Sequence, residues 1–134
     1  ELGEMLQESD QELADLLWFA VRDYAMQASD GDLLAEATGH IAEIAFDYDE
    51  PTSAAEVWID FLNWRREPES SSDSEAVLTA YDEIVRAAEM DGAQAVAATY
   101  GYQQAQFQKL VDSDDPRATV GNWLPGSDPL ETWS

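Results

Sequence analysis

The chain has no cysteine, a single histidine and very few cations. Without cysteine it can form no disulfide, and it offers no thiol nucleophile and no thiolate ligand for a metal. This absence fits a reducing cytoplasm, which is the location we expect. Its apolar runs are far too short to cross a bilayer, and the acidic residues 1–5 lack the basic start of a secretory signal. The sequence therefore predicts no membrane segment and no export signal, although the missing initiator Met leaves a trimmed leader or a longer parent protein open.

Positive charge is scarce along the whole chain. Six Lys and Arg stand against 29 Asp and Glu, for a formal net charge of −23, and Lys109 is the single lysine. Proteins that bind nucleic acid release counterions by placing a basic footprint on the phosphates, and six scattered cations form no such footprint. The sequence predicts no direct contact with nucleic acid.

The acid excess has two interpretations. At molar salt the Debye length falls to about 3 Å, so a strongly acidic surface no longer repels itself and its carboxylates keep the protein hydrated. This favours a halophilic cytoplasm. The alternative is an acidic inhibitor, immunity protein or DNA mimic whose carboxylates cover a basic cleft in a partner. The shortage of lysine in every segment favours salt adaptation, because a mimic needs acid only where it binds.

The rest of the composition is that of a folded protein. Apolar residues make up 45% of the chain and aromatic residues 10%, more than disordered acidic tails carry. A length of 134 residues is typical of one domain, so we expect a single domain over residues 1–134. Apolar residues recur at helical spacing, and no strand-like alternation competes with it. The sequence predicts an all-α fold, an antiparallel bundle of four to five helices with an irregular Trp-containing C-terminal tail packed on it.

Three helices are expected in the first half of the chain. The second runs to about Phe46, because Pro51 disfavours helical geometry in the residue before it. The third begins at the capping box Ser53–Glu56. The first covers about residues 9–28, opens on a capping box and turns an apolar stripe to the core: Leu13, Leu16, Leu17, Ala20, Val21 and Tyr24.

Two further helices and the tail are expected in the second half. The polar stretch 67–74 predicts a flexible loop, and the capping box Ser72–Glu75 opens a helix that ends near Gly92. The last helix, about 93–111, contains Gly101, which costs it roughly 1 kcal/mol relative to alanine. Burying a large apolar side chain contributes roughly 1.5–3 kcal/mol, so we expect the tail to pack through its large apolar residues: Trp123, Leu124, Leu130 and Trp133.

The single histidine provides the feature that most resembles a catalytic site. His40 lies four residues after Glu36 and three before Glu43, so the three side chains share one helix face. Glu and His at this spacing occur in di-metal carboxylate bundles, but those sites draw Glu from several helices and need a second Glu-x-x-His. We expect a solvated polar face with no metal and no cofactor. A metal-binding helical-bundle enzyme that uses this face is a further alternative.

One local anomaly provides a candidate for partner binding. Two Trp, a Phe and the only dibasic pair of the chain gather within residues 58–66. Because Trp and Arg are enriched at binding hot spots, Trp64, Arg65 and Arg66 are the candidate partner-binding residues. In the alternative interpretation Trp64 packs under the tail, while the two arginines cap the helix end and meet nearby acids.

No catalytic motif accompanies these features. The chain contains no Gly-x-Ser-x-Gly elbow, no Gly-rich phosphate loop and no twelve-residue calcium loop. We therefore expect a non-enzymatic protein-interaction module, such as an adaptor, an assembly factor or a regulatory subunit, in a high-salt cytoplasm. Its partner is expected to be a protein, and the sequence leaves a homodimer open.

Overall fold

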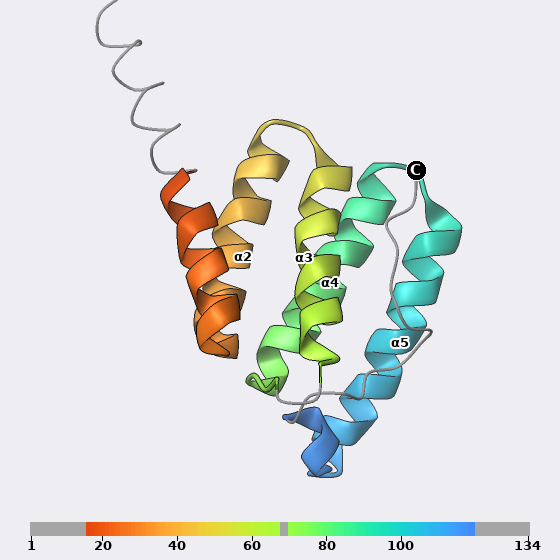
Figure 1. Ribbon diagram of the computed structural model, residues 1–134. Coiled ribbons are helices and arrows are strands. Elements are labelled where there is room, and N and C mark those ends of the chain that lie inside the picture. Colours follow the sequence, from red (N-terminus) through yellow and green to blue (C-terminus); the bar gives the residue numbers. More distant parts are fainter. Residues whose placement is uncertain (1–15, 68–69, 120–134) are drawn as a thin grey trace, which may run out of the picture.

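The computed structural model describes residues 16–67 and 70–119, and this part of the chain is built from helices (Figure 1). The helices run alternately up and down, and no strand occurs among the described residues, which confirms the predicted all-α bundle. The capping box within residues 9–12 and the tail residues 120–134 lie outside the described ranges. The elements follow in chain order: a helical segment over residues 16–28, α2 (Gly31–Asp47), α3 (Pro51–Arg65), α4 (Ser74–Met90), α5 (Gln94–Asp112) and a 3-10 turn, η1 (Pro116–Ala118).

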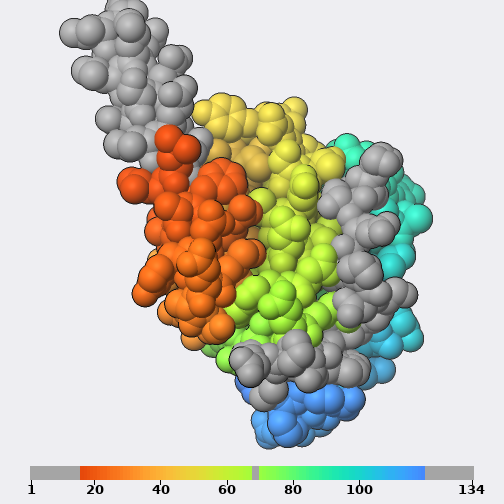
Figure 2. All heavy atoms as spheres, viewed as in Figure 1, coloured from red at the N-terminus to blue at the C-terminus, as the bar shows by residue number. Residues whose placement is uncertain are grey.

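Each helix packs mainly on its neighbours in the chain. The most extensive contacts join α2 to α3, α3 to α4 and α4 to α5, and η1 folds back on α5. Figure 2 shows segment 16–28, in red, at the edge of this array. No helix within the described ranges is long and apolar enough to span a bilayer. The helices share one apolar core, whose largest fully buried apolar and aromatic side chains are Leu34, Ile59, Phe61, Leu62, Val77, Tyr81, Ile84 and Phe107.

Two helix starts differ from the predicted capping boxes. Helix α3 begins at Pro51, ahead of Ser53, because proline has a φ suited to the first turn and lacks only an N–H that has no helical partner there. Helix α4 is capped by Asp73 instead of Ser72. The Asp73 carboxylate accepts a hydrogen bond from the Glu75 N–H at 3.1 Å, which satisfies one of the free donors of the first turn.

The first helix turns a different face to the core from the one predicted. Of the predicted stripe, Leu16, Leu17, Ala20 and Tyr24 are exposed, Val21 is half-buried, and Leu13 lies outside the described ranges. Ala25 is fully buried and Trp18 half-buried instead. The predicted core stripe is therefore wrong for these exposed residues. Segment 16–28 has two apolar stripes of the same helical period, and a helix at the edge of an array buries one of them.

Gly31 lies where the start of α2 meets the loop before α4. A Cβ at this position would overlap the carbonyl oxygen of Ser71. The substitution Gly31→Ala should therefore displace the loop or the helix start and lower the free energy of unfolding by about 1–3 kcal/mol. The matched control is Gly101→Ala in α5, where the added methyl group meets open space and should raise that free energy by about 1 kcal/mol. Denaturant unfolding measures both, and an unchanged midpoint for Gly31→Ala would contradict the close approach.

Candidate functional site

The predicted polar face of α2 borders a groove. Glu36, His40 and Glu43 line a hollow of about 410 Å³ together with Trp58 of α3 and two residues of α4. The imidazole of His40 stacks on the indole of Trp18, with ring centroids 3.9 Å apart and planes 9° from parallel. Within the described ranges, no group of three or more His, Asp and Glu side chains is placed to hold a metal ion. The stacking of His40 on Trp18 joins α2 to segment 16–28.

The candidate partner-binding residues lie largely inside the bundle. Trp64 is 8% exposed and Arg65 is 0% exposed, while Arg66 is half-buried. Arg65 donates from Nε to the Ser72 hydroxyl at 3.0 Å and from Nη2 to the Ala118 carbonyl oxygen at 3.2 Å. Its guanidinium thus joins α3 to the α3–α4 loop and to η1. Partner binding by this set stays a prediction, and two of the three side chains would have to leave the interior to fulfil it.

The α3–α4 loop is anchored where the sequence predicted flexibility. Ser70 and Ser72 are buried, and the Ser70 hydroxyl donates to the Trp64 carbonyl oxygen at 2.8 Å. Burial lowers the pKa of Arg65 to about 10, which leaves its guanidinium charged at neutral pH. A charged donor forms the stronger kind of hydrogen bond with a neutral hydroxyl or carbonyl. The serines of this polar stretch contributed to the prediction of flexibility. In the structure, the hydroxyl groups of Ser70 and Ser72 form the hydrogen bonds that anchor this part of the loop.

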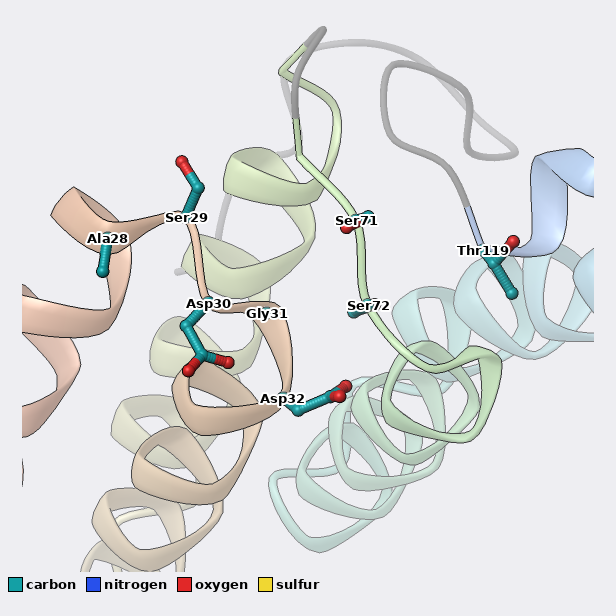
Figure 3. Close-up of a pocket in the computed structure, with 8 residues that line it drawn as sticks. All are labelled: Ala28, Ser29, Asp30, Gly31, Asp32, Ser71, Ser72 and Thr119. Carbon is teal, nitrogen blue, oxygen red and sulfur yellow. The ribbon is translucent and has the colours of Figure 1, made fainter.

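An open, acidic hollow of about 620 Å³ lies where the α2 start meets the α3–α4 loop (Figure 3). Asp30 caps α2 by accepting a hydrogen bond from the Leu33 N–H at 3.1 Å. Asp32 accepts one from the Asp73 N–H at 3.0 Å and so links the starts of α2 and α4. Both carboxylates thus stabilise helix N-termini, where negative charge is favoured. The residues around the hollow are Ala28, Ser29, Asp30, Gly31, Asp32, Ser71, Ser72 and Thr119.

Exposed apolar side chains occur on and beside segment 16–28. Leu16 is 67% exposed and Tyr24 65% exposed, and Leu17 and Phe19 are exposed on the same segment. Tyr48, which follows α2, is also exposed and shares a groove with Phe19. We call these five residues the N-terminal apolar surface. Contiguous exposed apolar patches are a feature of interaction sites in general, and these five side chains belong to a chain of net charge −23.

The groove that Phe19 and Tyr48 share has mainly apolar walls and a volume of about 320 Å³. Segment 16–28, α2 and α3 each contribute to it. Its size is at the lower end of the range for ligand pockets, which suits side chains of a partner better than a large free ligand. The lining residues are Phe19, Ile41, Ile44, Ala45, Tyr48, Glu50, Ser53 and Val57.

Acidic residues border the α2 end of the groove. Glu50 lines it, and Asp47 and Asp49 flank Tyr48 on the exposed turn between α2 and α3. Such a rim repels acidic groups and attracts basic ones, with a range that salt shortens. The groove therefore combines apolar walls with a negative edge.

Arg22 supplies one cation on this side of the molecule. Its guanidinium lies 5.0 Å from the centre of the Phe19 ring, within the range of a cation–π contact, and 3.9 Å from the Asp23 carboxylate. Burial, and then repulsion from Glu56, raise the pKa of Asp60 on α3, while Arg22 acts in the opposite direction. Arg22 thus lies among acidic residues, with Asp23 beside it in the chain and Asp60 near it on α3.

Comparisons with protein-family models, with curated proteins and with solved structures returned no match. The N-terminal apolar surface is therefore the main basis for a function. The sequence contains a signal for it, namely the apolar stripe with Leu16, Leu17 and Tyr24, which was expected to face the core and instead faces solvent. Only the position of this helix at the edge of the array decides which stripe faces solvent (Figure 1).

Proposed function

We propose that this chain is a protein-interaction module, acting as an adaptor, assembly factor or regulatory subunit, that binds a protein partner through its N-terminal apolar surface in a high-salt cytoplasm and catalyses no reaction. The observation that supports this most directly is the exposure of Leu16, Leu17 and Tyr24 on one helix. Amphipathic helices dock through such apolar faces. Molar salt screens the surrounding carboxylates, so contact between apolar groups provides the affinity.

A second candidate function is that of an acidic inhibitor, immunity protein or DNA mimic that covers a basic cleft. The net charge of −23 supports it. The two functions differ in their response to salt. Binding through carboxylates weakens steeply as salt rises, whereas binding through apolar side chains persists at molar salt.

The combined substitution Leu17→Glu and Tyr24→Glu tests the proposed surface. Both side chains are exposed, so the bundle should stay folded while partner retention falls roughly tenfold or more, as expected for the loss of hot-spot contacts. The matched control is Met90→Glu with Tyr102→Glu, which alters exposed apolar residues on α4 and α5. The measurement is quantitative affinity purification from native lysate in molar KCl, with circular dichroism as the check on folding.

The result that supports the proposal is one protein retained by wild type and by the control variant, and lost from the Leu17 and Tyr24 variant. Equal retention by both variants would contradict a role for this surface. Retention by wild type only at low salt would favour the acidic inhibitor instead, because it would show that carboxylates provide the affinity.

A further inference from the structure

We propose that the groove between segment 16–28, α2 and α3 binds an amphipathic helix of the partner, with an apolar anchor in the groove and basic residues on both sides of the anchor. This inference rests on the function proposed above, and it adds the chemistry of the partner. It follows from three properties of the described residues: the walls of the groove, the kind of backbone around it, and the charge on its rim.

The walls favour an apolar anchor. Phe19 and Tyr48 stand exposed at the groove, and Ile44 and Val57 are half-buried between them and the core. An aliphatic or aromatic side chain seated there removes apolar area of both partners from water, at roughly 25 cal/mol per Å². Three separate elements hold these walls in place, so the groove exists before the partner arrives and binding loses little freedom in this chain.

The backbone around the groove favours a helical partner over an extended one. The groove lies between helices, and the described residues contain no strand whose edge could pair with an added strand. An extended segment would leave its own N–H and C=O groups without partners on such a surface. A helix satisfies these groups internally and presents anchors at helical spacing, which is the way amphipathic helices enter apolar grooves.

The rim favours basic flanks on that helix. Glu50 lines the groove, Asp47 and Asp49 are exposed on either side of Tyr48 in the chain, and Asp23 pairs with Arg22, whose guanidinium lies over the Phe19 ring. A helix with acidic flanks, such as a segment of a second copy of this chain, would add like charge to this rim. Lys or Arg on the flanks would meet carboxylates directly, which selects the partner even where salt removes long-range attraction.

Three synthetic peptides test the inference on the full chain in molar KCl. The first is an amphipathic helix with leucines at three- and four-residue spacing and lysines on both flanks, the second carries Glu for each Lys, and the third is a scrambled version of the first. Fluorescence anisotropy should show saturable binding of the first peptide, at least tenfold weaker binding of the second and no saturable binding of the third. The substitution Tyr48→Ser should weaken the first interaction roughly tenfold, while the matched Tyr102→Ser on α5 leaves it unchanged.

The following outcomes would overturn the inference. Equal binding of the Lys and Glu peptides, or of the ordered and scrambled ones, would exclude a basic amphipathic occupant. Sedimentation that shows a dimer of wild type, and a monomer of Tyr48→Ser, would assign the groove to a second copy. If Tyr48→Ser leaves peptide and partner binding intact while the Leu17 and Tyr24 variant loses its partner, the interaction function stands and the groove proposal fails. If neither variant affects partner retention, both proposals fail.

Discussion

The chain is expected to lose its helical structure when KCl falls below about 0.1 M, where the Debye length grows to ~10 Å and carboxylates across the surface repel one another. With 29 acidic and six basic residues, most carboxylates have no cation to neutralise them at neutral pH. Circular dichroism during a KCl titration measures the effect. The helical signal should be full at molar KCl and should fall as salt is removed.

Two ion pairs of the described residues are exposed and offset little of this repulsion. Arg86 lies 3.5 Å from Glu83, and Arg117 lies 2.9 Å from Asp115, but both arginine side chains are more than half exposed. Exposed pairs of this kind contribute little to stability, because water and salt screen them and holding two long side chains together costs entropy. A neutral osmolyte at matched osmolality is the control, because it favours compact states without screening charge. A fully helical chain with an unchanged unfolding midpoint at low salt would refute the high-salt assignment.

Replacing Arg65 with alanine is expected to lower the free energy of unfolding by about 3–5 kcal/mol. A hydrogen bond to a charged group contributes ~1.5–3 kcal/mol, and Arg65 donates two, to Ser72 and to the Ala118 carbonyl. The substitution also leaves a cavity in a fully buried site, which adds to the loss. Denaturant unfolding in molar KCl measures the change.

Two further variants separate the causes of that loss. Arg65→Met keeps most of the side-chain volume and removes the hydrogen-bond donors. It should therefore recover only that part of the free energy of unfolding that Arg65→Ala loses through the cavity. Arg86→Ala is the matched control for an arginine at the surface, where the side chain contacts Glu83 and the Phe46 ring, and it should cost less than about 1 kcal/mol. Similar losses for Arg65→Ala and Arg86→Ala would contradict the structural role of Arg65.

The helical architecture could be predicted because its signals are local. Pro51 marks the boundary between α2 and α3, and Gly92 marks the boundary between α4 and α5. Gly92 adopts a positive φ of 74°, a conformation that favours glycine. The helix beginning at residue 31 was predicted to end near Phe46 and ends at Asp47. Periodicity and turn residues act over a few positions, so they can be interpreted without knowledge of the fold.

The features that depend on tertiary contact could not be predicted in this way. Arg65 is buried because it meets the carbonyl of Ala118, 53 residues further along the chain, and no spacing rule relates these two positions. Ser72 was predicted to cap α4, but Asp73 caps this helix, and the Ser72 hydroxyl instead accepts a hydrogen bond from Arg65. Which apolar stripe of segment 16–28 faces solvent depends on how this helix packs on its neighbours, and it lies at the edge of the array (Figure 1).

The ordering of the helices has a consequence for how the molecule folds. Because extensive contacts join helices that are adjacent in the chain, most native contacts close short loops, and chains with such low contact order reach their native state in microseconds to milliseconds. The hydrogen bond from Arg65 to Ala118 is an exception, since it closes a loop of 53 residues and pays a larger entropy of closure. Helices can therefore form and pair stepwise along the chain, whereas long-range hydrogen bonds such as this one, and the one from the Asp73 N–H to Asp32, form only once distant segments have met.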